Sequence, residues 1–171
     1  MSSATWVVEG RPREEDTEYL RRAIEMSKQS RDAGQRPFGA LVVLDRRVLA
    51  EAHSIRSREH DATAHSEMRV LRAASSLHPP PALASATLYT SAEPCAMCAG
   101  ALYWSGVGRL VFGLSEARLR SLAGRDPANL TLSLPCRDLF ARGQRPIEVI
   151  GPLLDDEAEV PHRGYWQKSL T

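Results

Sequence analysis

The sequence has 171 residues, of which 43% are hydrophobic and 25% charged, and its formal net charge is +1. This length and composition predict one globular domain over residues 1–171, and the balanced charge gives no electrostatic footprint for nucleic acid. The first residues lack a secretory signal, no stretch approaches the roughly 20 apolar residues of a membrane span, and three cysteines are too few for a disulfide framework, so we expect a cytoplasmic protein without a membrane partner.

The spacing of apolar residues predicts that helices and strands alternate along the chain. In chain order the elements are a helix over 15–34, a β-hairpin over 38–53, a helix over 63–76, a stiff proline loop over 78–83, a strand over 86–91, a helix over 95–104, a strand over 109–114, a loop over 124–135, a strand over 146–154 and a final helix over 157–170. Gly34 ends the first helix, Asp45 and Arg46 form the hairpin turn, and Thr63 or Asp61 caps the second helix. This alternation predicts a three-layer α/β sandwich around one sheet of five strands.

Two short motifs carry the chemistry of this sequence: H-S-E at residues 65–67 and P-C-A-M-C at residues 94–98. Together they match H-x-E…P-C-x-x-C, the signature of zinc deaminases that act on nucleobases. Zinc binds imidazole nitrogen and thiolate sulfur, and a catalytic site keeps three protein ligands and one open position. We therefore predict His65, Cys95 and Cys98 as zinc ligands. Glu67 is predicted to take a proton from water and deliver it to the ring nitrogen and the departing amine.

Each half of this pattern has another interpretation when it is taken alone. A lone C-x-x-C is also typical of redox sites and of structural zinc sites. The redox interpretation leaves His65 and Glu67 without a role, and structural zinc would need a fourth protein ligand at a recognisable spacing. A zinc or redox module without catalysis would make Glu67 dispensable. Cys136 lies outside the motif and is expected to be a buried, inert cysteine.

The chain resembles the cytidine and deoxycytidylate deaminase superfamily in the stretches RPFGALVV, HDATAHSE, LYTSAEPCAMCAGALYW and GRLVFG. The likeness covers about residues 37–113 and is nearest to the branch of bacterial guanine deaminases, tRNA adenosine deaminases and fungal cytosine deaminase. It implies a cytidine deaminase-like fold, a three-layer α/β/α sandwich with a central five-stranded mixed sheet. It also implies hydrolytic deamination, one zinc ion in each active site and a homodimer.

The resemblance further implies a set of substrate-binding residues. Phe38 would line the pocket, Ala64 would contact the ring, the backbone of Ser66 and Cys95 would face the base, and Trp104 would form a wall of the pocket. In many α/β domains Phe38 and Trp104 would instead be core residues. Ser54 stands where the family usually has an asparagine that hydrogen-bonds the base or ribose, and Ser66 stands where it usually has alanine. Such a change in a hydrogen-bonding site can alter which ring is accepted.

These features predict a small-molecule deaminase acting on a free nucleobase, a nucleoside or a related amino-heterocycle. Phe38 and the Tyr103-Trp104 pair favour a purine, guanine or adenine, over cytosine or an aminotriazine. The alternative is a tRNA-specific adenosine deaminase, but the net charge of +1 and the acidic start of the segment DDEAEVPHRGYW offer little to phosphates, so we do not expect a nucleic-acid partner. Glu116, the only carboxylate just after the strand 109–114, is expected to be a solvated surface charge.

Overall fold

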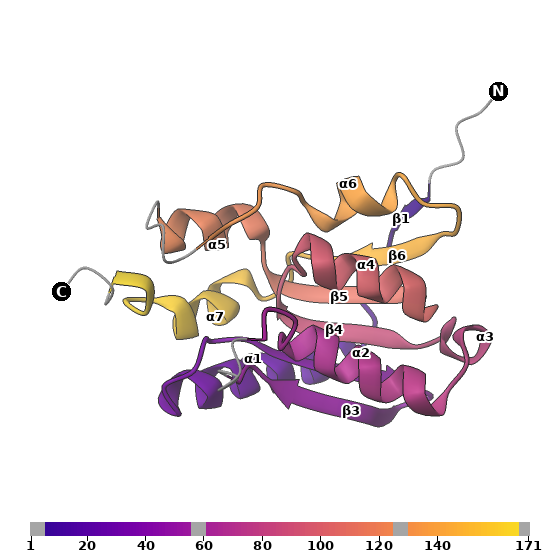
Figure 1. The fold of residues 1–171 in the computed structure, drawn as a ribbon, viewed down its shortest axis with the longest axis horizontal. Coiled ribbons are helices and arrows are strands. Elements are labelled where there is room, and N and C mark those ends of the chain that lie inside the picture. Colours follow the sequence, from indigo (N-terminus) through magenta and orange to yellow (C-terminus); the bar gives the residue numbers. More distant parts are fainter. Residues whose placement is uncertain (1–5, 56–60, 125–129, 168–171) are drawn as a thin grey trace.

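The computed structural model describes residues 6–55, 61–124 and 130–167, and it places helices on both faces of one six-stranded sheet (Figure 1). The strands are β1 (Val7–Glu9), β2 (Gly39–Leu44), β3 (Arg47–His53), β4 (Thr87–Ala92), β5 (Arg109–Leu114) and β6 (Ile147–Ile150). The helices are α1 (Asp16–Asp32), α2 (Ser66–Leu77), α3 (Pro80–Leu83), α4 (Ala96–Ser105), α5 (Glu116–Ala123), α6 (Cys136–Phe140), α7 (Asp155–Glu159) and the 3-10 turn η1 (Val160–His162). Among these helices, none is both long and apolar enough to cross a membrane.

The sheet is mixed and has the strand order β1-β6-β5-β4-β2-β3. Strand β2 runs antiparallel to β3 and β4, whereas β4, β5, β6 and β1 are parallel to one another. The predicted hairpin is confirmed, because Asp45 and Arg46 connect β2 to β3 with positive φ angles of 49° and 62°. A two-residue turn of this kind matches the right-handed twist of the strands that it joins.

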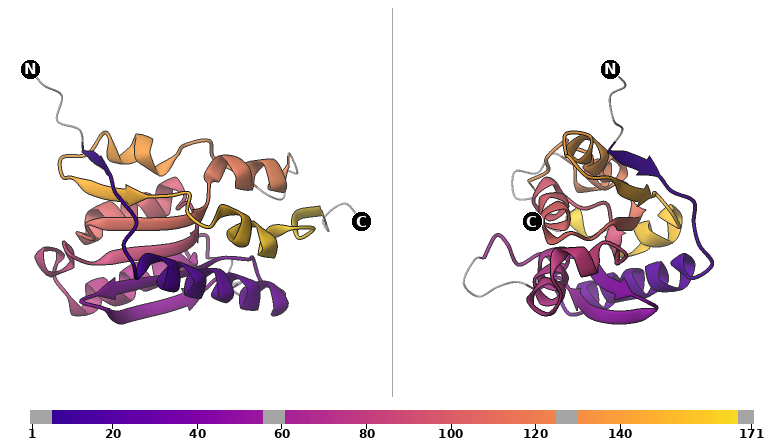
Figure 2. Two further views of the ribbon diagram at one scale, coloured as in Figure 1. Left: turned by 180° about the vertical axis from the view of Figure 1, so that it is seen from behind. Right: turned by 90° about the vertical axis from the view of Figure 1, so that its right-hand side faces the viewer.

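Successive side chains of the central strands point to opposite faces of the sheet, and each face has its own helical layer. Ala40 and Val42 pack with residues of α2 and α4, whereas Leu41 and Val43 pack with Leu20 and other residues of α1. The view from behind shows α1 and α7 on the face opposite α2, α4 and α6 (Figure 2). The predicted three-layer α/β/α sandwich is therefore confirmed.

The predicted number of strands is wrong, because the sheet has a sixth strand, β1. Its three residues pair in parallel with β6, and Val7 lies opposite Ile147 in the register. A strand of three residues at the edge of a sheet carries too short an apolar pattern to be recognised. Its pairing depends on a partner about 140 residues further along the chain.

Two predicted helical boundaries also need correction. The final helix predicted over 157–170 is instead the short α7 followed by η1. A longer helix is disfavoured because Pro161 lacks a backbone donor and Gly164 has a φ of +66°. Residues 168–170 of this prediction lie outside the described residues. Conversely, the proline loop predicted over 78–83 contains the short helix α3, since proline is tolerated in the first turn of a helix.

A buried ion pair connects α1 to the start of β5. Two nitrogen atoms of Arg109 each lie 2.7 Å from a different carboxylate oxygen of Asp16, and the Tyr89 hydroxyl donates to Asp16 over 2.8 Å. Arg109 is 3% exposed and Asp16 is fully buried. Burial acts to raise the pKa of Asp16, but hydrogen bonds from Arg109, the Arg13 backbone and Tyr89 outweigh it and lower the pKa overall.

The substitution Arg109→Met leaves the Asp16 carboxylate buried without its cation. We expect the free energy of unfolding at pH 7 to fall by about 3–5 kcal/mol, and the added change Asp16→Asn to recover part of that loss. Urea unfolding measures the free energy of unfolding of the single and the double variant. A loss below about 1 kcal/mol for Arg109→Met would contradict a stabilising role of the ion pair. Because the pKa of Asp16 is lower in the folded chain, its contribution is present above the unfolded value of about 3.9 and is lost as the pH falls through the folded pKa.

Candidate active site

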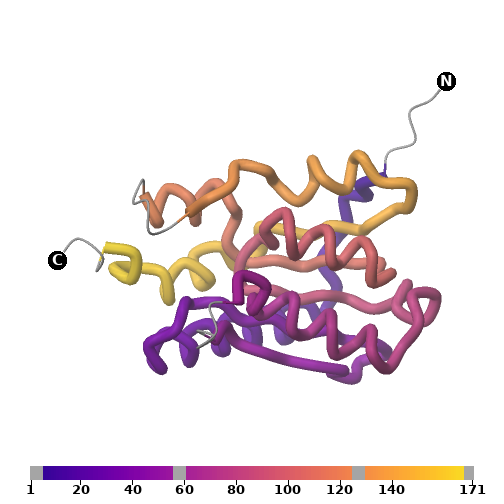
Figure 3. Tube along the Cα trace, viewed as in Figure 1, coloured from indigo at the N-terminus to yellow at the C-terminus, as the bar shows by residue number. Residues whose placement is uncertain are grey.

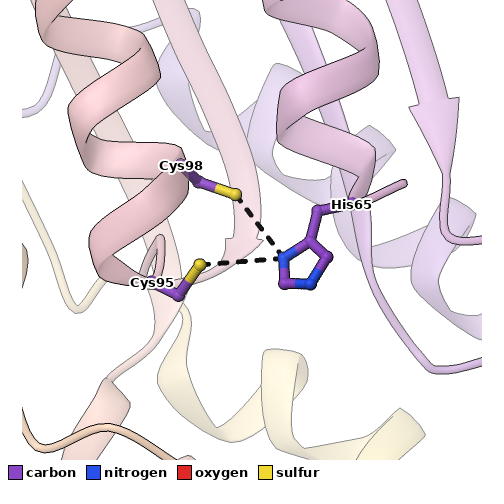
Figure 4. Close-up of side chains that lie close together, drawn as sticks. All are labelled: His65, Cys95 and Cys98. Atoms are coloured by element: carbon purple, nitrogen blue, oxygen red, sulfur yellow. Dashed lines mark hydrogen bonds between the residues drawn. The ribbon is translucent and has the colours of Figure 1, made fainter. Parts of the chain in front are cut away.

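The predicted zinc ligands lie at the N-terminal ends of two neighbouring helices (Figure 4). His65 and Cys95 are the N-cap residues of α2 and α4, and both have extended backbone. His65 takes the cap position that was predicted for Thr63 or Asp61; the Asp61 carboxylate instead accepts hydrogen bonds from the Thr63 backbone and hydroxyl, at 2.8 Å and 2.6 Å. Two helix N-termini therefore point at one cluster, and their dipoles favour negative charge there.

The geometry of the cluster fits a zinc ion. His65 Nδ1 lies 3.7 Å from Cys95 Sγ and 3.6 Å from Cys98 Sγ, and the three ligand atoms are within 4.8 Å of one another. A tetrahedral zinc ion with bonds of about 2.3 Å to sulfur and 2.05 Å to nitrogen requires sulfur and nitrogen to lie about 3.6 Å apart. Both sulfur–nitrogen distances therefore match those around a tetrahedral zinc ion.

The protonation of the cluster also suits a soft cation. A hydrogen bond from the Cys98 thiol lowers the pKa of Cys95 to about 4, so Cys95 is a thiolate at neutral pH. The same hydrogen bond and burial raise the pKa of Cys98, and the hydrogen bond with Cys95 raises the pKa of His65. Metal binding displaces protons from such ligands, because thiolate and neutral imidazole are the forms that coordinate.

Glu67 lies in the first turn of α2, beside the cluster but outside it. Its side chain is 5% exposed, and burial raises the pKa of its carboxyl group. Glu67 Oε2 accepts a hydrogen bond of 2.9 Å from the Ser66 hydroxyl, and Oε1 accepts one of 3.2 Å from the Thr90 hydroxyl. A buried carboxyl group with a raised pKa holds a proton more readily than an exposed one, which suits a group that accepts and returns protons.

A cavity of about 140 Å³ opens beside the cluster at the end of the sheet where β4 and β5 end. His65 and Glu67 line it together with three of the predicted substrate residues, Phe38, Ser54 and Ser66. In α/β sheets, the carboxyl ends of the strands are the usual position of ligand sites. The structure therefore brings most of the sequence-predicted site into one cavity.

Two predicted substrate residues lie elsewhere. Ala64 and Trp104 line a groove between α2 and α4 instead of the cavity, and the Trp104 side chain is 80% exposed. Trp104 follows Cys98 by six residues within α4, which at about 100° per residue places the two side chains roughly 120° apart around the helix. Within this chain Trp104 therefore does not form a wall of the cavity.

The cavity contains charged residues that the sequence did not assign to it. Glu93 accepts hydrogen bonds of 2.9 Å from the backbone nitrogens of Glu116 and Cys136, and so connects the end of β4 to the starts of α5 and α6. Glu116 and Arg120 also line the cavity. Glu116 is half-buried, and burial raises its pKa, so it is only partly the solvated surface charge that was expected. The place of Glu93 directly after a strand was the signal that could have located it.

An aromatic cluster covers one side of the cavity. The ring centroids of Phe38 and Trp166 lie 6.1 Å apart, and the His162 ring of η1 lies 5.3 Å from that of Phe38. The Trp166 indole donates a 3.3 Å hydrogen bond to His162 Nδ1, and burial lowers the pKa of His162 to about 4. His162 is therefore neutral.

Helices α5 and α7 lie side by side at this end of the sheet, where Arg118 of α5 forms ion pairs with Asp155 and Asp156 of α7 (Figure 3).

The fold and the cavity together define a class of protein. A mixed sheet covered by helices on both faces, with a His-Cys-Cys cluster beside a buried glutamate, is the arrangement of zinc-dependent deaminases. Residues 13–114 match the family "Cytidine and deoxycytidylate deaminase zinc-binding region", and the chain belongs to this family.

Individual relatives agree with this assignment. The chain is 41% identical over 153 residues to the Schizosaccharomyces pombe protein named "Probable cytosine deaminase". This match covers 90% of this chain and 93% of the relative. It is 39% identical over 104 residues to the tRNA-specific adenosine deaminase of Bacillus subtilis, covering 61% of this chain and 65% of the relative. Among solved structures, the guanine deaminase of Nitrosomonas europaea matches with a TM-score of 0.69 and 26% identity, covering 94% of this chain and 87% of that one.

The predicted family and class of activity are thereby confirmed. The protein is a deaminase, a hydrolase that acts on C–N bonds, with a zinc-binding region. The position of the three ligand side chains agrees with that cofactor.

Proposed function

We propose that the whole chain forms one deaminase domain that releases ammonia from a small amino-heterocycle: a free nucleobase, a nucleoside or a related ring. One observation carries the proposal. The three ligand atoms suited to zinc and the buried Glu67 carboxyl group are next to the same small cavity. Neither a redox site nor a closed structural zinc site requires a buried glutamate beside the metal ligands.

Each residue has a distinct role in this proposal. A zinc ion held by His65, Cys95 and Cys98 would supply a Lewis acid that lowers the pKa of water to about 7. Glu67 accepts a proton from the attacking water and returns it to the ring nitrogen. It then takes the proton of the newly formed hydroxyl group and delivers it to the departing amine. The C–N bond breaks as a C–O bond forms, so the amino-heterocycle and water become a carbonyl compound and ammonia.

The size of the cavity supports a substrate with one heterocyclic ring system. Its volume of about 140 Å³ is below the roughly 300–1,000 Å³ of pockets for drug-sized ligands. Phe38 lies in the cavity and supports the predicted preference for a purine, whereas Trp104, the other residue on which that preference rests, lies outside it. Relatives named for cytosine and for guanine make these the first two rings to test.

Because one relative is a tRNA-specific adenosine deaminase, adenosine in a tRNA anticodon is the second candidate substrate. The cavity offers a phosphate backbone little net attraction, because Arg36 and Arg120 share its lining with Glu93 and Glu116. A nucleic-acid substrate is therefore the alternative in the assay below. We also propose a cytoplasmic location, since none of the three cysteines forms a disulfide bond, which suits a reducing compartment.

Ammonia release from a panel of substrates tests the proposed function. The panel contains guanine, adenine, cytosine, their nucleosides, an aminotriazine and an anticodon stem-loop RNA, each with zinc-quantified protein. We expect release from one small ring and none from the RNA. Release from the RNA alone would replace the proposal with the tRNA activity, and silence across the panel would contradict it.

We further propose that α2 and α4 form the homodimer interface. Helix α4 has no charged residue in its ten positions, and helices that are apolar all round are normally covered. Trp104 nevertheless stays 80% exposed, and the space above Gly100 is open. The adjoining groove of about 450 Å³ has Met68 in its lining and both Asp61 and Arg72 among its polar residues, so a two-fold related copy can pair opposite charges.

The substitution Trp104→Glu tests this interface. Removing a central tryptophan and adding a charge should raise the dimer dissociation constant by about 30-fold or more. Leu77→Glu is the matched control, because Leu77 is 74% exposed on α2 but does not line the groove. Sedimentation velocity should show a dimer for the wild type and Leu77→Glu, and a monomer for Trp104→Glu. A monomeric wild type would contradict the proposal.

A further inference from the structure

The Glu67 carboxyl group is held at both of its oxygen atoms by hydroxyl groups. The Ser66 hydroxyl donates to Oε2 over 2.9 Å, and the Thr90 hydroxyl donates to Oε1 over 3.2 Å. Both hydroxyl-bearing residues are fully buried, and Glu67 is 5% exposed. The two anchors come from different elements, the first turn of α2 and the central strand β4.

This arrangement restricts a side chain that is otherwise flexible. The last torsion of a glutamate side chain is broad, so the plane of an unanchored carboxyl group rotates easily. One hydrogen bond at each oxygen fixes that plane between α2 and β4. The position of a proton-transferring group matters at this scale, because displacements of about 1 Å can cost about 100-fold in rate.

The chemistry of a hydroxyl group suits both states of a proton carrier. A hydroxyl can donate to a carboxylate, and after rotation its oxygen can accept from a carboxylic acid. A backbone N–H or an ammonium group in the same place can only donate and would favour the ionised form alone. Ser66 and Thr90 can therefore hold Glu67 both before and after it takes up a proton.

We propose that Ser66 and Thr90 are positioning residues that orient the Glu67 carboxyl group for the two proton transfers of deamination. The proposal rests on the proposed function, in which Glu67 carries the proton. Ser66 also lines the cavity, whereas Thr90 does not, so the effect of Thr90 is expected to reach the substrate only through Glu67. The role concerns the side chain of Ser66, in addition to the backbone contact that the family resemblance implies.

Removing the hydroxyl groups one at a time gives the first test. We expect Ser66→Ala to lower kcat by about tenfold, since a hydrogen bond to an ionised group is lost, and Thr90→Val, with the longer bond, by about fivefold. KM and zinc content should stay within about twofold of the wild type in both variants. Thr90→Ser keeps the hydroxyl group and should keep most of kcat, and the solvent isotope effect on kcat should rise only where a hydroxyl is removed.

A matched control separates this role from a general effect of burial. Ser27 on α1 is also fully buried, and its hydroxyl donates one hydrogen bond of 2.7 Å to the Ile24 carbonyl. Ser27→Ala should therefore cost stability without a selective loss of kcat. If Ser66→Ala and Ser27→Ala alter kcat equally, or if Thr90→Ser is as slow as Thr90→Val, the positioning role is contradicted.

Combining the changes with Glu67→Ala distinguishes the failure of this proposal from the failure of the proposed function. Because Ser66 and Thr90 act through Glu67, adding Ser66→Ala to Glu67→Ala should leave the residual rate unchanged. If Glu67→Ala keeps wild-type turnover, the proposed function itself is wrong. If Glu67→Ala is inactive while Ser66→Ala and Thr90→Val keep the wild-type kcat, only the positioning role is wrong.

Discussion

Replacing Glu67 by alanine should reduce ammonia release by about 10³-fold or more while zinc remains bound at the wild-type ratio. General acid–base catalysis contributes about 10²–10⁴-fold, and we assign both proton transfers to this one side chain. Glu67 is not a ligand of the cluster, which consists of His65, Cys95 and Cys98. In this variant the initial rate of ammonia release should therefore fall while the zinc content stays unchanged, and both can be measured on the same protein sample.

Two further variants make this result specific. Glu67→Gln keeps the shape of the side chain but cannot carry the proton, so it should be as slow as Glu67→Ala. Glu25→Ala makes the same change at an exposed position of α1 and should have no effect. If Glu67→Ala kept more than about a tenth of the wild-type rate, a general acid–base role could not be assigned to Glu67.

Replacing Cys98 by serine should remove the metal and lower the stability of the fold. The variant keeps only two of the three ligands, and Cys98 is fully buried. A ligand that binds only the folded state stabilises it, so the wild type should unfold at a lower temperature after chelation. Cys98→Ser should already melt at that lower temperature, and a chelator should not change it further.

Cys136→Ser provides the matched control for Cys98→Ser. Cys136 is likewise fully buried, but it is not part of the ligand cluster. Its substitution should cost some stability through burial of a polar group, yet zinc binding and the response to a chelator should persist. If Cys98→Ser retained zinc as tightly as Cys136→Ser does, the assignment of Cys98 as a ligand would be wrong.

The metal ligands and Glu67 could be predicted from the sequence because the residues within each motif lie close together along the chain. His65 and Glu67 are two residues apart, and Cys95 and Cys98 are three apart, so each pair is fixed by one helix start. Zinc chemistry then requires the two pairs to meet, since three ligands must surround one ion. The structure places the ligand atoms together, as these constraints predict.

Other features depend on contacts that no local pattern records. Strand β1 forms only by pairing with β6, far along the chain. The direction of Trp104 follows from which face of α4 packs on the sheet, and the hydrogen bond between Thr90 and Glu67 joins a strand to a helix. The end of the final helix was predictable in part, because Pro161 and Gly164 both disfavour helix.

Zinc titration of metal-free protein is the measurement that tests the central claim most directly. Ammonia release from the substrate found in the panel is followed as zinc is added, for the wild type and for Glu67→Ala. We expect the wild-type rate to rise in proportion to zinc and to level off at one ion per chain, while Glu67→Ala binds the same amount and stays inactive. A rate that does not depend on zinc, or an active Glu67→Ala protein, would contradict a zinc-dependent deaminase in which Glu67 carries the proton.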